Sequence, residues 1–254
     1  MFERHTFYIL ERDLRGVLTE ISNTVYHACA EQNWWNNVES DTPLIGASYK
    51  EIEQLINKYG LENVVFVGSV ESTNHFLVSY GRKPVAALNI PPELDDEQFL
   101  HRKIWRDISK DDVRVLAESH PNLLIKPGQT PKLFSLTRFD KFALDNIPDY
   151  EPLFVQEELR SPIVAEWRVF VKFGKIVDIR PYWIKKWTMP DQNVVQAMVQ
   201  QLRKHPAITL DVGVLSTGPT VVIECHYFLA CGTYGFEGVP MLNMMRVAWI
   251  FQTK

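Results

Sequence analysis

The segment TLDVGVLSTGPTVVIECHYFLACGTYGFEG, residues 209–238, decides the fold of this chain. It opens with two apolar runs, residues 209–215 and 220–226, on either side of the short sequence Ser-Thr-Gly-Pro. Two apolar runs joined by a four-residue loop that contains glycine are typical of a β-hairpin. We therefore predict two adjacent antiparallel strands here.

The predicted hairpin brings two carboxylates together. If Leu215 pairs with Thr220, Asp211 lies opposite Glu224, and alternation puts His226 and Gly213 on their face and Ile223 on the other. Opposed carboxylates lie about 4.5–5.5 Å apart at Cβ and repel unless a positive charge lies between them. Mg²⁺ bound to phosphate oxygens would remove the repulsion. The alternative is that one carboxylate points to solvent at a sheet edge.

The order of these residues resembles a known family. An Asp-apolar-Gly strand, a short turn, an apolar-Glu-x-[Asn/His] strand and a Gly-rich tail are similar to the C-terminal metal-binding end of ATP-grasp enzymes. In that family the Asp and the Glu hold Mg²⁺ on the phosphates of ATP. The resemblance implies that Asp211 and Glu224 are metal ligands. It makes His226, where the family usually has Asn, the third ligand, and it implies that Gly232-Thr233-Tyr234-Gly235 shapes an acceptor pocket.

Composition narrows the class of protein. The chain has 254 residues, 46% hydrophobic and 23% charged, which is ordinary for a globular protein with a sizeable core. A net charge of −4 argues against bulk nucleic-acid binding, and no apolar run is as long as a membrane span. Cys29, Cys225 and Cys231 show no CxxC spacing and are interpreted as reduced thiols. We expect a cytoplasmic protein, which could form oligomers.

Helical and strand patterns alternate in the first third of the chain. Apolar residues at spacings of three and four predict a helix over residues 14–32. A second helix is predicted over residues 48–59, where Ser48 and Glu51 form a capping box. The run VVFVGSV, residues 64–70, is typical of a strand buried on both faces. These elements predict a small α/β domain.

A Pro-Pro sequence followed by acidic residues, residues 91–96, is the best candidate for a linker. We therefore predict an N-terminal α/β domain over residues 1–95 and a second domain over residues 96–254. In the first of these, Trp34 and Trp35 could form a stacking platform for a base or a sugar. Paired tryptophans also cap the edge of a core, and the sequence leaves both interpretations open.

Two lysines surround a Gly-Pro loop in the second domain. The short strand LLIKP, residues 123–127, contains Lys126, and the following loop contains Lys132. Alone, such lysines are usually solvated. The segment resembles the apolar-Lys-Pro segment of ATP-grasp proteins, whose lysines contact nucleotide phosphates. The resemblance implies this role for both lysines.

The sequence LFVQEEL, residues 153–159, resembles the hinge of the same family. In that hinge, backbone groups contact the adenine edge and a carboxylate binds the ribose. The resemblance implies backbone contacts from Glu157 and Leu159. It implies that Glu158 or Glu166 lies near the ribose. An acidic strand end at a solvated sheet edge is the alternative.

A second hairpin contains two arginines. The sequence AEWRVFVKF, residues 165–173, alternates, and it resembles a strand of the ribosomal-protein glutamate ligases and of small phage and bacterial ATP-grasp proteins. There the arginine steadies the γ-phosphate or an acyl phosphate, a role implied for Arg168. A two-residue loop at residues 174–175 would put Arg180 on the other face. A three-residue loop, 173–175, would make the two arginines cross-strand partners that need an anion between them, and we favour this pairing.

The resemblance runs over residues 120–240 and implies an α/β protein in which an ATP-grasp fold, with nucleotide between its two lobes, follows a small α/β domain. Its members use ATP and Mg²⁺ to phosphorylate a carboxylate, and an amine then attacks the acyl phosphate. Catalysis of this kind depends on positioning and charge stabilisation. The sequence does not identify the carboxylate and amine partners, which could be a small molecule or a peptide. A nucleotide- or partner-binding module and a small-molecule kinase are the alternative functions.

Overall fold

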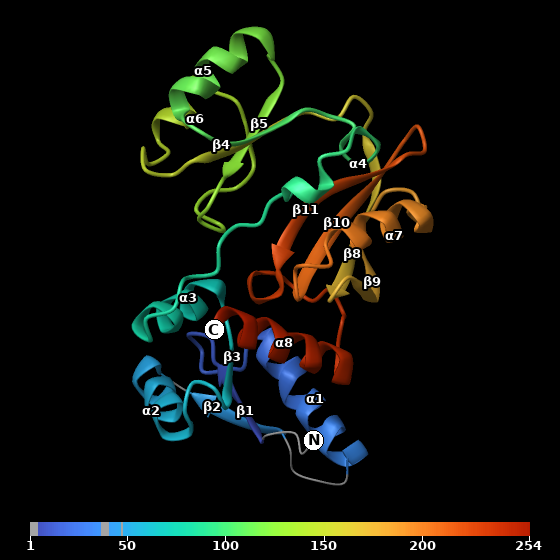
Figure 1. The fold of residues 1–254 in the computed structure, drawn as a ribbon. Helices are drawn as coiled ribbons and strands as arrows, with labels where there is room; N and C mark the ends of the chain where they lie inside the picture. The colour runs from blue at the N-terminus through green and yellow to red at the C-terminus, as the bar shows by residue number, and fades with distance from the viewer. Residues whose placement is uncertain (1–4, 37–40, 47) are drawn as a thin grey trace. The chain divides into compact units, whose positions relative to one another are not determined.

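The computed structural model describes residues 5–36, 41–46 and 48–254 (Figure 1). By their contacts, the residues form two compact units. The first unit combines Met1–Val85 with Pro206–Ile208 and Tyr227–Lys254, and the second combines Ala86–His205 with Thr209–His226. The chain thus returns to the first unit after completing the second. The expected division into domains at residues 95 and 96 stays a prediction.

The first unit is built on a parallel sheet of three strands in the order β2-β1-β3. The strands are β1 (Thr6–Glu11), β2 (Asp41–Gly46) and β3 (Val64–Val67). The helices of this unit are α1 (Glu20–Asn36), α2 (Tyr49–Tyr59), α3 (Val70–Ser79) and α8 (Gly238–Gln252), with the 3-10 turn η2 (Phe228–Ala230). Helices α1 and α8 lie side by side and both pack on β3 (Figure 1). The predicted strand over residues 64–67 is confirmed.

The prediction of the first helix is wrong at its start. Helix α1 begins at Glu20, not at residue 14, because a turn occupies the preceding residues. The N–H of Asp13 donates to the carbonyl oxygen of Val17 at 2.7 Å, and Gly16 has a φ of 78°. Leu14 is fully exposed, so its helical spacing was coincidental. The second helix begins as predicted, since the Ser48 side chain accepts from the N–H of Glu51.

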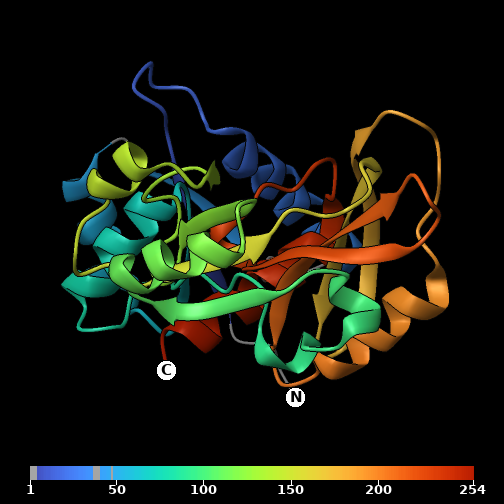
Figure 2. The same ribbon diagram turned by 90° about the horizontal axis from the view of Figure 1, so that it is seen from above.

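The second unit contains two four-stranded sheets, which form its two lobes (Figures 1 and 2). One sheet has the order β4-β7-β5-β6, and the other has the order β11-β10-β8-β9. The strands are β4 (Ile104–Ile108), β5 (Leu123–Pro127), β6 (Thr137–Arg138), β7 (Leu153–Glu157), β8 (Ile163–Lys172), β9 (Lys175–Ile184), β10 (Ala207–Leu215) and β11 (Thr220–Tyr227). The α/β class predicted from the sequence is confirmed.

Short helices cover the sheets of the second unit. They are η1 (Pro92–Leu94), α4 (Glu97–Leu100), α5 (Lys110–Ser119), α6 (Lys141–Asp145) and α7 (Gln192–Gln201). Helix α5 opens with a capping box in which Ser109 and Asp112 bond to each other's backbone N–H. The Pro-Pro segment expected to be a linker is ordered as η1, because Leu94 is fully buried there. Helix α7 lies along the sheet next to β9 (Figure 2).

The β10–β11 hairpin is confirmed, but its turn differs from the prediction. The N–H of Leu215 donates to the carbonyl oxygen of Pro219 at 2.9 Å, so the turn closes one residue earlier than pairing with Thr220 requires. A Cβ on Gly213 would lie 2.9 Å from Cδ1 of Ile223, so these two residues share a face. The predicted placement of Ile223 on the opposite face is therefore wrong. A shift of one residue exchanges the faces of a strand, and strict alternation does not hold along β11.

The β8–β9 hairpin reaches the predicted arginine pairing by another route. Its turn has two residues, Phe173 and Gly174, with φ angles of 49° and 68°, as turns of type I′ require. The predicted three-residue loop is therefore wrong. An irregularity in register between Phe170 and Val171 then shifts the pairing by one, so that Arg168 and Arg180 are cross-strand partners.

Two further expectations concern the whole chain. Within the residues that the structure describes, no helix combines the length and the apolar character needed to cross a membrane. All three cysteines are free thiols, Cys29 and Cys225 buried and Cys231 partly exposed.

Candidate functional site

Five charged or ionisable side chains meet on four strands of the second unit. We call this set the charge cluster: Lys126 on β5, Arg168 on β8, Asp211 on β10, and Glu224 and His226 on β11. All five were predicted from the sequence as site residues, and the structure brings them together. The two lobes contribute to it jointly, since β5 belongs to one sheet and the other strands to the second.

Asp211 and Arg168 form a buried bidentate ion pair. Nε of Arg168 donates to Oδ1 of Asp211 at 2.7 Å, and Nη2 donates to Oδ2 at 2.6 Å. Only 3% of Arg168 and none of Asp211 is exposed. The Tyr182 ring centroid lies 5.3 Å from Cζ of Arg168. A buried charge is tolerated when a matched partner satisfies it, so each residue depends on the other.

Glu224 is held by two cationic neighbours. The Nζ of Lys126 contacts Oε2 of Glu224, and Nε2 of His226 lies 2.8 Å from Oε1. Burial tends to raise the pKa of Glu224. The hydrogen bond from His226 and the charges of Lys126 and His226 outweigh burial and hold that pKa well below its usual range. Glu224 therefore stays ionised in the fold.

Three members of the charge cluster fit a divalent cation. Asp211, Glu224 and His226 each offer one ligand atom, and these atoms lie within 4.8 Å of one another. Nε2 of His226 lies 3.9 Å from Oδ2 of Asp211. Carboxylate oxygens suit hard cations such as Mg²⁺, and imidazole nitrogen is also a ligand for transition metals. The donor set is therefore compatible with the predicted metal site.

Glu166 adds a further negative charge beside the charge cluster. It lies two residues before Arg168 on β8 and is half-buried. Its pKa is raised, first by burial and then by the negative charges of Asp211 and Glu224, while Lys126 acts in the opposite direction. Repulsion between carboxylates, expected between Asp211 and Glu224, thus falls on Glu166. Its contact with a ribose stays a prediction.

Each of the two cross-strand arginines has its own carboxylate. Nε of Arg180 donates to Oδ2 of Asp178 at 2.7 Å, whereas Arg168 binds Asp211. The predicted pairing of the arginines is confirmed by the register. The anion expected between them is replaced by these two acidic partners, since each guanidinium group is neutralised separately. Binding of phosphate by the pair stays a prediction.

The other predicted site residues lie outside the charge cluster. Lys132 is exposed, at a φ of 61°, in the loop after β5. Glu157 accepts a hydrogen bond from the N–H of Lys103 at 3.1 Å, Glu158 pairs with Arg138, and Leu159 follows β7. Glu157 pairs with Leu123 at the start of β5, whereas Lys126 lies near its end. The nucleotide contacts of these four residues stay predictions.

Two residues that shape the site were missed from the sequence. Arg102 donates to Oε1 of Gln156 at 3.0 and 2.9 Å and to the carbonyl oxygens of Val222 and Ile223 at 2.9 and 3.3 Å, so it joins the two sheets next to Glu224. Burial lowers its pKa to about 10. In the sequence it belongs to a His-Arg-Lys run, which is typical of a solvated surface.

The second missed residue, Glu151, organises the loop after β5. Its carboxylate is buried and accepts hydrogen bonds from the N–H groups of Gln129 and Thr130 at 2.8 and 2.9 Å. It also accepts from the Thr130 hydroxyl at 2.6 Å. Nothing in the local sequence distinguishes this glutamate from a surface acid, because its partners are more than twenty residues away.

Comparison with protein families defines the class to which this fold and site belong. Residues 99–244, more than half of the chain, match the model of an ATP-grasp domain, the second family of its clade. The chain therefore belongs to this family of ATP-grasp domains. The resemblance drawn from the order of charged residues is confirmed. A search of the curated proteins found no match.

Solved structures with the same fold include several ligases. The ADP complex of PurK, an N5-carboxyaminoimidazole ribonucleotide synthetase, has a TM-score of 0.59 at 10% identity, covering 97% of this chain and 77% of that one. D-alanine–D-alanine ligase from Bacillus anthracis has a TM-score of 0.55 at 12% identity, covering 98% of each chain. The ATP-grasp ligase PsnB in complex with a minimal precursor matches at a TM-score of 0.40 and 16% identity, over 64% of this chain and 58% of that one. At such identities the likeness concerns the fold alone.

Proposed function

We propose that this protein is an ATP- and Mg²⁺-dependent carboxylate–amine ligase that acts through an acyl phosphate. The observation that carries the proposal is the charge cluster, which combines three candidate metal ligands with a lysine and an arginine in an ATP-grasp domain. These residue types stabilise and position transferring phosphoryl groups, and the chemistry needs no nucleophile on the protein.

Each member of the charge cluster has a role in this proposal. Asp211, Glu224 and His226 would hold Mg²⁺, which neutralises charge on the ATP phosphates when bound. Lys126 and Arg168 would donate to phosphate oxygens. Other predicted contacts would assist: Arg180 and Lys132 at phosphate, Glu157 and Leu159 at adenine, and Glu158 or Glu166 at ribose.

Binding of ATP would require an exchange of partners. Without ligand, Lys126 binds Glu224 and Arg168 binds Asp211. Phosphate oxygens would replace the carboxylates as partners of the two cations. The carboxylates would then be available to the metal. Because charges of both signs are exchanged together, none is left unpaired during binding.

The test is formation of a hydroxamate. The protein is incubated with ATP, Mg²⁺, a panel of carboxylic acids and hydroxylamine, which traps an acyl phosphate as a hydroxamate. We expect hydroxamate and ADP with at least one acid, and loss of both by at least about a hundredfold in Glu224→Gln. Glu118→Gln, which changes an exposed carboxylate on α5, is the matched control and should retain activity.

Two other outcomes identify the alternative functions. ADP release with a phosphorylated acceptor and no hydroxamate, seen by mass spectrometry, would make the protein a small-molecule kinase. ATP binding that is indifferent to Mg²⁺, with neither ADP nor hydroxamate, would make it a binding module. The internal ion pairs and His226 in place of Asn are the features that fit a module.

A further inference from the structure

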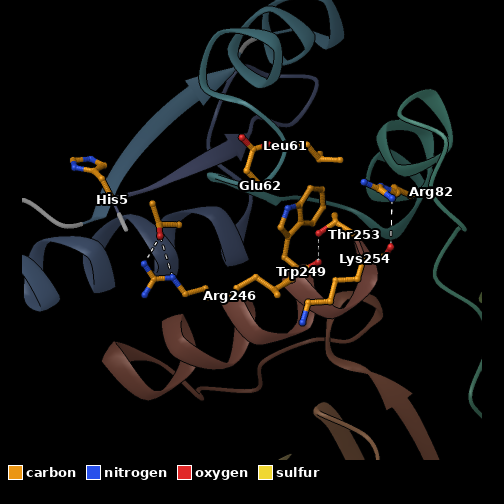
Figure 3. Close-up of a pocket in the computed structure, with 10 residues that line it drawn as sticks. His5, Leu61, Glu62, Arg82, Arg246, Trp249, Thr253 and Lys254 are labelled. Atoms are coloured by element: carbon orange, nitrogen blue, oxygen red, sulfur yellow. Dashed lines mark hydrogen bonds between the residues drawn. The ribbon is translucent and has the colours of Figure 1, made fainter. Parts of the chain in front are cut away.

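The first unit contains a cavity of about 490 Å³ (Figure 3). This volume lies in the range of small-molecule sites, roughly 300–1,000 Å³. Thr6, which opens β1, and Leu61 and Glu62, which precede β3, line it together with Trp249 and other residues of α8. The cavity therefore lies at the amino ends of parallel strands. Ligands of open α/β sheets usually bind at the carboxyl ends, so this position is unusual.

A buried donor in the cavity has no acceptor. Trp249 is 1% exposed, and its Nε1 has no hydrogen-bond partner within residues 5–36, 41–46 and 48–254. The indole N–H can only donate, and a buried donor left unpaired is destabilising. Because Trp249 lines the cavity, an oxygen atom of a ligand there can satisfy the N–H. The ligand should therefore carry an acceptor.

The charges around the cavity favour an anion. Arg82 is exposed, and its one recorded hydrogen bond runs to the carbonyl oxygen of Lys254 at 3.4 Å, which leaves most of its guanidinium group available. Arg246 differs, because Thr6 accepts from its Nε at 3.0 Å and Asp41 lies 3.5 Å from its Nη2. The planar fork of an arginine matches a carboxylate. Arg82 is thus the cation best placed to recognise it.

The remaining lining distinguishes among anions. Leu61 and Ile250 contribute apolar surface, so the ligand should have an apolar body. Glu62 lines the same cavity, and its negative charge would repel a dianion such as a phosphate monoester more than a carboxylate. The donors, the apolar side chains and Glu62 together select a monoanion with an apolar body.

We propose that the first unit binds a small organic carboxylate in this cavity. Its oxygens accept hydrogen bonds from the indole N–H of Trp249 and from Arg82, and its apolar body lies against Leu61 and Ile250. The site uses no residue of the charge cluster, so it stands or falls independently of the ligase proposal.

Phenylacetate is a suitable probe, with phenylacetamide as its uncharged counterpart and inorganic phosphate as an anion without an apolar body. Calorimetric titration of the full chain should show phenylacetate binding about tenfold or more tighter than either of the others. Arg82→Gln and Trp249→Phe should each weaken phenylacetate binding by a similar factor. Arg15→Gln and Trp167→Phe are the controls, because Arg15 pairs with Asp13 and the Trp167 indole already donates to Thr188 at 2.9 Å.

Several results would overturn the proposal. They are equal affinity for phenylacetate and phenylacetamide, tighter binding of inorganic phosphate, or no detectable binding of phenylacetate. Retention of full affinity in Arg82→Gln would overturn it as well, and that exposed substitution leaves the core of the unit unchanged. Thermal unfolding of both variants without probe shows whether weaker binding reflects loss of the fold.

Discussion

The charge cluster of the second unit and the cavity of the first treat polar groups in opposite ways. In the charge cluster, Arg168 is neutralised by Asp211, and Lys126 by Glu224. In the cavity, the Trp249 N–H has no acceptor among the described residues. The first arrangement must exchange internal partners before it binds anything, whereas the second already presents a donor. Substitutions in the charge cluster should therefore change stability, and those in the cavity should mainly change affinity.

The largest effect is expected from Asp211→Asn. It would leave the buried Arg168 charge without its partner, which typically costs about 3–5 kcal/mol of unfolding free energy. The measurement is urea-induced unfolding in the presence of chelator. Asp178→Asn is the control, because its partner Arg180 is 40% exposed and such pairs contribute less than about 1 kcal/mol.

This expectation reverses the one drawn from the sequence. Repulsion between Asp211 and Glu224 predicts that removing either carboxylate makes the metal-free protein no less stable. The structure instead gives each carboxylate a cation, so removal exposes an unpaired positive charge. An Asp211→Asn protein as stable as wild type would restore the repulsion model and would mean that the pair with Arg168 contributes nothing.

A smaller loss with a pH signature is expected from Glu224→Gln. Its hydrogen bonds involve charged groups, so the loss near neutral pH should be about 1.5–3 kcal/mol. Because the pKa of Glu224 is lowered in the fold, its stabilisation is present above the ordinary carboxyl pKa and is lost as the pH falls. The difference between wild type and variant should therefore shrink below about pH 4.5. Unfolding midpoints measured across acidic and neutral pH test this, and a difference that does not change with pH would contradict it.

The smallest effect, with the opposite sign, is expected from Glu166→Gln. The pKa of Glu166 is raised in the fold, so the folded protein favours its protonated form. Ionised Glu166 is a penalty that appears as the pH rises above the ordinary carboxyl value. The variant should be about 0.5–1 kcal/mol more stable than wild type near neutral pH and equal to it in acid. Loss of stability at neutral pH would mean that Glu166 is paired rather than repelled.

Much of the site could be predicted because its residues lie on strands with clear alternation. Asp211, Glu224 and His226 were assigned to one face from a hairpin alone, and they meet. The partner of each charge could not be predicted, because side-chain reach across two sheets depends on coordinates. Arg102 was missed for that reason, since its acceptors on Gln156, Val222 and Ile223 come from distant parts of the chain.

The errors in the fold also have local physical causes. The arginine register was right although the loop was wrong, because a shorter turn and an irregularity in β8–β9 compensate. Helix α8 was missed entirely. It is apolar almost all round, with Met241, Met244, Met245 and Trp249 buried, so no polar stripe marks its period.

The return of the chain to the first unit has a consequence for synthesis on the ribosome. Strands β1 to β3 emerge early, but α8, which packs on α1 and β3, is made after every residue of the second unit. Domains usually fold as units during translation in the order of synthesis. Here the later unit is complete before the earlier one, and the first sheet waits in the nascent chain for a cover encoded by residues 238–252.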